Sequence, residues 1–268
     1  MDLKDVISEE WLDAEKLSKN YKFAKPYPHI VMENFIKKGL LESVANEFPD
    51  LSNQEQNVVK KYNNNREIKL ASKGMKLLSP AALYLNSYLQ SDLMLKYLNK
   101  LSGINETLIS DPYLNGGGYH EIKSGGFLKI HADFNKHAEL KLYRRLNMLI
   151  YLNKNWLDSW GGELELFDKS RNKSSKKIFP RFNTAVIFTT SDTTYHGHPY
   201  PLKCPENYSR RSIAYYYFSI SEPKDETSSK YHSTIFVDDT KRKLNMKKIL
   251  IDIIPPVITR IIKRVFFK

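Results

Sequence analysis

Apolar residues recur at helical spacing through the first 108 residues. This spacing predicts helices over three segments: 9–19, 36–47 and 80–102. A short β-like run at 27–32 separates the first two segments, and the Asn-rich stretch 53–66 has the composition of a loop. We therefore expect residues 1–108 to form a mainly helical support.

The spacing changes to a period of two beyond residue 108. Along 146–153 an apolar face alternates with a more polar one: Leu146, Met148, Ile150 and Leu152 against Asn147, Leu149, Tyr151 and Asn153. Residues 185–188 and 213–220 are rich in the β-branched and aromatic residues typical of strands, whereas 169–177 is expected to be a solvated loop. Because no helices alternate with these strands, we expect 109–221 to be an antiparallel barrel or sandwich. The predicted fold class is mainly β with supporting α-helices.

Composition places the chain among ordinary soluble proteins. Hydrophobic residues make up 41% and charged residues 27% of the 268 residues. The single cysteine, Cys204, excludes an internal disulfide and fits a reducing compartment. The first residues lack the apolar core of a secretory signal, and no stretch approaches the ~20 apolar residues of a membrane-spanning helix. We therefore expect a cytoplasmic protein.

The net charge of +12 belongs mainly to the C-terminal tail. Nine Lys or Arg against one Asp give residues 241–268 a charge of +8, which leaves +4 for residues 1–240. Apolar residues of the tail recur at helical spacing on both sides of Pro255 and Pro256, with the basic residues mostly outside these stripes. This basic amphipathic pattern fits a helix packed on the barrel, or peripheral contact with an anionic membrane surface. Binding to nucleic acid or a partner protein is less favoured.

Two familiar motifs fail on their context. The glycines of 116–118 and 125–126 are followed neither by a helical pattern nor by Lys-Ser or Lys-Thr, so they are not phosphate loops or dinucleotide-binding turns. The chain also has no Gly-x-Ser-x-Gly sequence of the kind that holds a hydrolase nucleophile. We interpret the glycines as turns between strands.

A metal site is predicted around His131 and Asp133. Residues two apart on a strand point to the same face, so one imidazole and one carboxylate can reach one ion. A third ligand is available from His196 or His198, which follow an apolar strand-like run. Two histidines and one carboxylate form the facial triad of non-haem Fe(II) oxygenases, which leaves three coordination positions open.

A candidate anion-binding face lies on the segment 207–220. Arg210 and Ser212 share one face of the predicted strand, and a buried Arg there could hold a carboxylate with two charge-assisted hydrogen bonds. Ser212 would add a third. Arg211 points to the opposite face and is the weaker candidate.

At this point the sequence resembles a family, the 2-oxoglutarate- and Fe(II)-dependent dioxygenases, in the prolyl 4-hydroxylase-like branch. The resemblance runs from residue 27 to about residue 221. It is densest in six blocks: 116–121, 131–133, 145–156, 160–164, 195–199 and 210–212. The order and spacing of these blocks make the resemblance specific.

The resemblance implies a fold and a set of site residues. The fold would be a double-stranded β-helix, or jelly-roll barrel, with core 109–221 in a domain 1–240 that the tail 241–268 follows. The metal ligands would be His131, Asp133 and His196, with His198 structural. Arg210, Ser212 and Tyr151 would hold the far carboxylate of 2-oxoglutarate, and Tyr151 lies on the more polar face of its predicted strand.

The resemblance also implies an activity. The cofactors would be Fe(II) and 2-oxoglutarate, with O2 as a substrate and ascorbate as the supporting reductant. The protein would hydroxylate an unactivated C–H bond of a prolyl residue or a small molecule and release succinate and CO2. We expect the loop 169–177 and the segment 199–209 to select the substrate. The alternative is a non-catalytic, metal-binding jelly-roll module that docks through its basic tail.

Overall fold

The computed structural model describes residues 2–171, 174–223 and 230–237. Its helices are α1 (Ala14–Lys22), α2 (Lys38–Asn46), α3 (Pro80–Leu89) and α4 (Asp92–Ser102), with single 3₁₀ turns at Leu3–Asp5, Glu9–Trp11, Leu51–Asn53 and Asp158–Trp160. The helical spacing of the N-terminal segments is thus confirmed. The predicted segment 80–102 is two helices, because the Ser91 side chain accepts from the backbone N–H of Met94 and starts a new helix there.

The strands are β1 (His29–Glu33), β2 (Val59–Asn63), β3 (Glu67–Ser72), β4 (Ile109–Ser110), β5 (Gly118–Lys123), β6 (Phe127–Ala132), β7 (Tyr143–Tyr151), β8 (Leu164–Phe167), β9 (Ser174–Ile178), β10 (Thr184–Thr189), β11 (Tyr195–His198), β12 (Ser209–Ser219) and β13 (Ile235–Phe236). Their main path runs β1-β10-β7-β12-β5-β3-β6-β11-β8-β9, with β13 on β6, β2 on β3 and β4 on β12. Each pairing between these strands is antiparallel.

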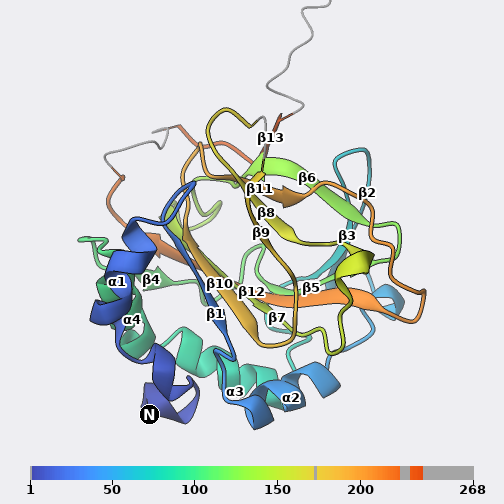
Figure 1. Ribbon diagram of the computed structural model, residues 1–268, viewed down its shortest axis with the longest axis horizontal. Helices are drawn as coiled ribbons and strands as arrows, with labels where there is room; N and C mark the ends of the chain where they lie inside the picture. Colours follow the sequence, from blue (N-terminus) through green and yellow to red (C-terminus); the bar gives the residue numbers. More distant parts are fainter. Residues whose placement is uncertain (1, 172–173, 224–229, 238–268) are drawn as a thin grey trace, which may run out of the picture.

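The strands curl into a barrel with the helices against one side (Figure 1). Strand β3 pairs with β5 at one end and with β6 at the other, so it joins the two halves of the barrel. The apolar side chains of β7, among them Leu146, Met148 and Ile150, lie in the main core with apolar side chains of α3 and α4. The other face of β7, with Asn147 and Tyr151, therefore turns to the barrel interior. The mainly β, jelly-roll prediction is confirmed.

Two predicted loops are partly strands. The stretch 53–66 contains β2, and 169–177 contains most of β9. Both strands lie at an edge and expose most of their polar side chains, so their composition resembles that of a loop, although their backbones pair with β3 and β8. In addition, β1, β2 and β3 bring parts of residues 1–108 into the sheet.

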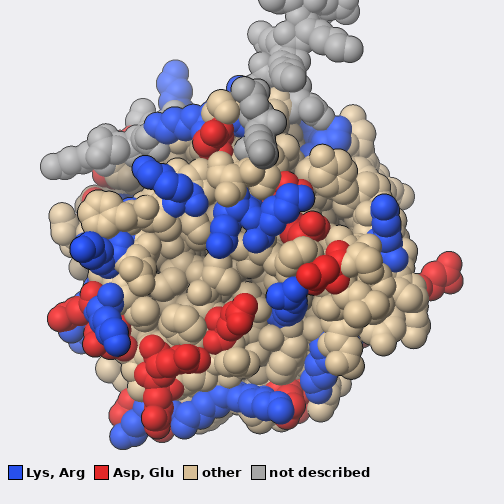
Figure 2. Space-filling view, in the orientation of Figure 1, with Lys and Arg blue, Asp and Glu red and all other residues tan. Residues whose placement is uncertain are grey.

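Charge on the face shown in Figure 2 is of both signs. Lys and Arg side chains lie among Asp and Glu rather than forming one continuous basic surface. This agrees with the small charge of +4 on residues 1–240. The predicted amphipathic tail 241–268 lies outside the described residues. Among the helices that are described, none is long and apolar enough to cross a membrane.

Candidate metal centre

Strand pairing brings His131 and His196 face to face. His196 on β11 lies directly opposite His131 on β6, and their rings are 4.4 Å apart between centroids. Gly197 permits this close approach, because a Cβ at that position would meet the carbonyl oxygens of Leu128 and Lys129 at 2.9 Å. Asp133 follows just after β6 ends. The predicted residues of the triad are therefore neighbours in space.

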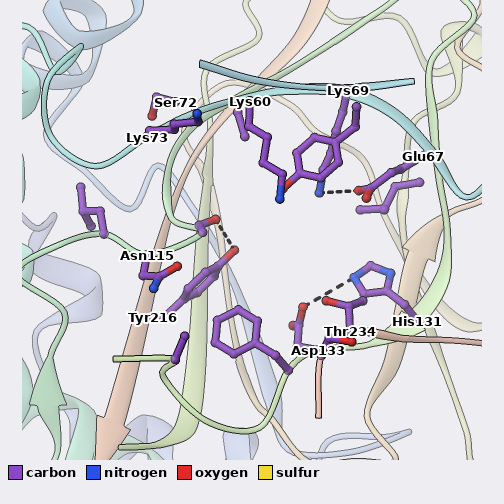
Figure 3. A pocket seen from close by; sticks show the side chains of 18 of the residues that line it. Lys60, Glu67, Lys69, Ser72, Lys73, Asn115, His131, Asp133, Tyr216 and Thr234 are labelled. Carbon is purple, nitrogen blue, oxygen red and sulfur yellow. Dashed lines mark hydrogen bonds and ion pairs between the residues drawn. The ribbon is translucent and has the colours of Figure 1, made fainter. Parts of the chain in front are cut away.

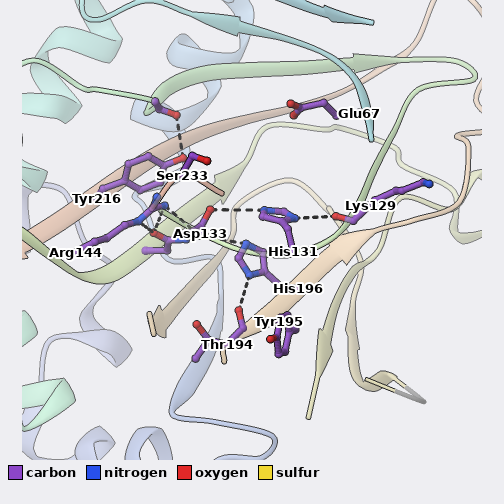
Figure 4. Close-up of polar contacts among 12 residues, drawn as sticks. Glu67, Lys129, His131, Asp133, Arg144, Thr194, Tyr195, His196, Tyr216 and Ser233 are labelled. Atoms are coloured by element: carbon purple, nitrogen blue, oxygen red, sulfur yellow. Dashed lines mark hydrogen bonds and ion pairs between the residues drawn. The ribbon is translucent and has the colours of Figure 1, made fainter. Parts of the chain in front are cut away.

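The ligand atoms of this group point at one another (Figure 4). Nε2 of His131 lies 3.6 Å from Oδ1 of Asp133, and Nε2 of His196 lies 3.4 Å from Oδ2. One nitrogen or oxygen from each residue fits within a span of 4.8 Å. All three side chains are largely buried. Two imidazoles and one carboxylate around one point are the donor set that non-haem Fe(II) uses.

Each histidine ring is oriented by a hydrogen bond on its far side. Nδ1 of His131 lies 2.8 Å from the carbonyl oxygen of Lys129, and Nδ1 of His196 lies 3.1 Å from that of Thr194. With Nδ1–H donating to a carbonyl, the lone pair of Nε2 is directed at the centre. The protein thus fixes both rings in the tautomer that a metal requires.

Asp133 is held by two side chains of β7. Nδ2 of Asn147 donates to Oδ2 of Asp133 at 2.7 Å, and the guanidinium of Arg144 lies 3.2 Å from the same oxygen. Burial by itself raises the pKa of the Asp133 carboxyl, but Arg144 and the two histidines outweigh burial and hold that pKa well below its usual range. The carboxylate is therefore ionised and oriented.

His196 is uncharged at neutral pH. Burial lowers the pKa of its imidazole to about 4, and the nearby Asp133 opposes this shift only in part. A neutral imidazole is the form that binds a metal ion, so His196 is prepared to act as a ligand.

A second polar group lies deeper in the barrel, on β7 and β12. Arg210 is buried, and its Nη2 donates to the hydroxyl of Tyr151 at 3.1 Å while its Nε donates to the carbonyl of Gly162 at 2.8 Å. Among the described residues no carboxylate lies within ion-pair distance of Arg210. Because a buried guanidinium without an anion is costly, this position fits an anionic ligand.

Side chains of β12 alternate between the barrel interior and the outside, as the sequence pattern predicts. Ser212 is buried, and it lies opposite Tyr151 on β7 and His120 on β5. Arg211 points outward, where its Nε lies 3.3 Å from a carboxylate oxygen of Glu121. Arg210, Ser212 and Tyr151 are thus placed together, and Arg211 is placed apart from them.

His198 is buried beside Arg210 but outside the group of three ligands. The residue is 3% exposed, and neither ring nitrogen has a hydrogen-bond partner among the described atoms. The pairing of β11 with β6 is irregular between His196 and His198, so the two rings are not held alike. Burial lowers the pKa of His198 well below its usual value, and Arg210 and Lys69 add to this shift.

A pocket of about 620 Å³ opens over His131 and Asp133 (Figure 3). Its walls come from β2, β3, the turn 113–116 and the segment 231–236. Among the described residues, none of 169–177 or 199–209 lines this pocket, and their proposed part in substrate choice stays a prediction. The β2–β3 hairpin, part of which we expected to be a loop, covers this side of the barrel.

Two contributors to the site were not predicted from the sequence. Asn147 had a signal, because it lies on the more polar face of the alternating segment. Arg144 had none, because it has the same parity as Leu146, whose side chain lies in the main core and not in the barrel interior. An irregularity in the β7–β12 register, where Arg144 pairs with Phe218 next to the Leu146–Tyr217 pair, shifts that parity. The guanidinium of Arg144 consequently lies 3.5 Å from the ring of Tyr216 and reaches Asp133.

Comparison with protein families gives one match. Residues 117–218 match the model of the 2OG-Fe(II) oxygenase superfamily. This stretch contains all three residues of the metal cluster as well as Tyr151, Arg210 and Ser212.

Solved structures of prolyl hydroxylases have a fold similar to that of this chain. A prolyl 4-hydroxylase from Pseudomonas putida has a TM-score of 0.54 and 13% identity, with 78% of this chain and 99% of that chain covered. A prolyl hydroxylase from Trichoplax adhaerens, solved with a peptide fragment of the hypoxia-inducible factor, has a TM-score of 0.54 and 18% identity over 79% and 91% of the chains. A study of prolyl 4-hydroxylases from Phytophthora capsici provides a structure with a TM-score of 0.51 and 16% identity over 91% and 75%.

Proposed function

We propose that this protein is a 2-oxoglutarate- and Fe(II)-dependent dioxygenase, because residues 117–218 match the model of the 2OG-Fe(II) oxygenase superfamily. It would hydroxylate an unactivated C–H bond, with one atom of O2 entering the product and the other entering succinate as CO2 leaves. One observation carries this proposal. A two-histidine, one-carboxylate cluster shares a barrel interior with a buried arginine that has no described acidic partner.

His131, Asp133 and His196 would hold Fe(II), and the bound metal would supply the activation of O2. Three protein donors would leave coordination positions of the ion open to other ligands. The carbonyls of Lys129 and Thr194 keep the rings oriented. Asn147 and Arg144 keep the Asp133 carboxylate ionised and in place.

Arg210, Tyr151 and Ser212 would hold the far carboxylate of 2-oxoglutarate. The guanidinium is already fixed by Gly162 and by the Tyr151 hydroxyl, so little side-chain freedom is lost when an anion binds. Charge-assisted hydrogen bonds to a carboxylate would replace the missing counter-charge. The cosubstrate would thus be fixed at its far end by Arg210 and at its near end by the metal.

The substrate is either a prolyl residue of a peptide or a small molecule. The Trichoplax enzyme with a similar fold was solved with a peptide fragment, and the pocket over His131 and Asp133 is open enough for either class. Ascorbate would keep the iron in the ferrous state and supply electrons when no substrate is present. The alternative, a metal-binding module without catalysis, does not account for the buried Arg210–Tyr151 pair.

The tail 241–268 is a separate element of the proposal and rests on its sequence alone. If the tail contacts an anionic membrane surface rather than packing on the barrel, the full chain should sediment with anionic liposomes but not with neutral ones, because each Lys or Arg near such a surface contributes ~1 kcal/mol. Salt should weaken the sedimentation, and removal of 241–268 should abolish it. Failure to sediment at low salt would contradict the membrane interpretation.

Succinate formation tests the proposed activity. The full chain is incubated with Fe(II), 2-oxoglutarate, ascorbate and O2 without added substrate. We expect slow succinate release that requires Fe(II) and O2. Metal binding without any succinate under these conditions would favour the non-catalytic module.

A further inference from the structure

We propose that the pocket over the metal centre takes a substrate that carries an oxyanion, a phosphate or a carboxylate, which lysines of the β2–β3 hairpin bind. This inference deepens the proposed function by naming a substrate class. It rests on the charge and geometry of the hairpin, which the proposed iron and cosubstrate sites do not use.

One face of the β2–β3 hairpin forms a wall of the pocket. Lys60 lies opposite Ala71 and Tyr62 lies opposite Lys69, so these four side chains project from the same face of the two strands. All four line the pocket, whereas Lys61 on the other face does not. Figure 3 shows the ammonium groups of Lys60 and Lys69 directed into the space above His131 and Asp133.

The positive charge on this wall is only partly balanced. Nζ of Lys69 lies 2.9 Å from a carboxylate oxygen of Glu67. Lys60 has no carboxylate partner among the residues that the structure describes, and its ammonium lies 4.6 Å from the ring centre of Tyr62. Lys73 donates to the backbone carbonyl of Gln56 instead of to an acid. The Lys60 ammonium is therefore available to an anionic ligand, and Lys73 has no carboxylate partner among the described residues.

Basic residues outnumber acidic ones in the pocket lining. Its basic residues are Lys60, Arg66, Lys69, Lys73 and Lys136, against the acidic residues Glu67, Asp133 and Glu139. Glu67 is paired with Lys69, and Asp133 faces the proposed metal. Concave walls of one charge strengthen the local potential and concentrate ligands of the opposite charge. A cationic substrate would be repelled from this pocket.

These lysines are distinct from the proposed cosubstrate clamp. Arg210 and Tyr151 are absent from the pocket lining, and they would hold the cosubstrate carboxylate inside the barrel. A substrate must reach the metal from the open side, where the hairpin lies. An oxyanion on that substrate would bind Lys60 and its neighbours, while Tyr62, Phe134 and Tyr216 offer flat surfaces to its apolar part.

The test uses three small probes that differ in charge: phenyl phosphate, benzoate and benzyl alcohol. Each is titrated calorimetrically into the full chain in the presence of Mn²⁺ and saturating 2-oxoglutarate, so that the clamp does not take the probe. We expect at least one of the two anions to bind about tenfold more tightly than the alcohol. Added salt should weaken the binding of that anion. If phenyl phosphate binds more tightly than benzoate, the oxyanion of the substrate is assigned as a phosphate. If benzoate binds more tightly, it is assigned as a carboxylate.

A matched pair of variants locates the binding. Lys60→Gln removes a charge from the pocket face, and Lys61→Gln removes the same charge from the opposite face of the same strand, where Lys61 donates to the carbonyl of Ser52. We expect Lys60→Gln to lower the affinity for the anionic probe about fivefold or more, and Lys61→Gln to change this affinity little. The benzyl alcohol titration should not distinguish the two variants.

Equal binding of anions and alcohol, or equal effects of the two variants, would overturn the proposal. Its failure is separable from that of the proposed function. Succinate formation by the unchanged protein reports only the cofactor chemistry, whereas the probe titrations report only the pocket. A protein that makes succinate but does not prefer the anions would retain its proposed activity and lose its proposed substrate class.

Discussion

The barrel interior contains two polar regions of opposite electrostatic character. The first, at His131, Asp133 and His196, presents a buried carboxylate and two neutral rings to a cation. The second, at Arg210 and Tyr151, presents a buried guanidinium with no described acidic partner to an anion. Neither region is electrostatically complete alone. A metal ion together with a dicarboxylate would complete both, which is why we assign them to one reaction.

The two regions are also built differently. The side chains of the three candidate metal ligands are each held by a hydrogen bond or an ion pair from outside the cluster. In the second region, Arg210 is fixed by Gly162 and Tyr151, but the neighbouring His198 has no partner on either ring nitrogen. The metal region is therefore organised before any ligand arrives, whereas the anion region still has donors to satisfy.

The largest effect is expected from removing a ligand of the metal region. Asp133→Ala, His131→Ala and His196→Ala should each abolish succinate formation and metal binding, because two donors hold Fe(II) poorly. Arg210→Ala serves as the control that keeps metal binding. Direct metal titration by calorimetry separates the two regions. Equal loss of metal binding in Arg210→Ala would show that they are not independent.

Acid should destabilise the metal-free protein through the buried His196. His196 has a pKa of about 4 when folded and ~6.5 when unfolded, so the unfolded chain binds more protons between these values. Stability is thus full above pH ~6.5 and falls as the pH drops toward 4, by about 2 kcal/mol at pH 5 for this group. Urea unfolding at pH 7.5 and pH 5 measures this loss. His196→Phe should reduce it, and an unchanged loss would contradict the assignment.

The anion region is tested by the two neighbouring arginines. Arg210→Ala should raise the KM for 2-oxoglutarate at least ~10-fold, since a hydrogen bond to a charged group contributes ~1.5–3 kcal/mol. Arg211→Ala should do much less, because Arg211 faces outward toward Glu121. Steady-state succinate assays give both values. Similar KM values for the two variants would refute the strand-face argument.

The smallest effect is expected at His198. His198→Ala should keep metal binding and retain some succinate formation, because its ring lies outside the ligand cluster. The expected effect of His198→Ala therefore differs from that of His196→Ala, two residues away. If His198→Ala were inactive and His196→Ala active, the choice of the third ligand would be wrong.

The sequence predicted those parts of the site that follow regular strand periodicity. The alternation along β7 placed Tyr151 and Asn147 inside, and the same parity placed Arg210 and Ser212 together on β12. It could not place Arg144, because a register shift reverses the parity there. It also missed the β2–β3 hairpin as a wall of the pocket. An edge strand of Lys, Tyr and Asn looks like a solvated loop until its backbone pairing is known.

The most direct test of the central claim is the affinity for 2-oxoglutarate with and without metal. The full chain is titrated with 2-oxoglutarate by calorimetry, first free of metal and then with saturating Mn²⁺. If the two regions bind opposite ends of one cosubstrate, Mn²⁺ should raise the affinity for 2-oxoglutarate at least ~10-fold. This is equivalent to ~1.4 kcal/mol of coupling free energy between the two sites. Equal affinity with and without the metal would contradict the account.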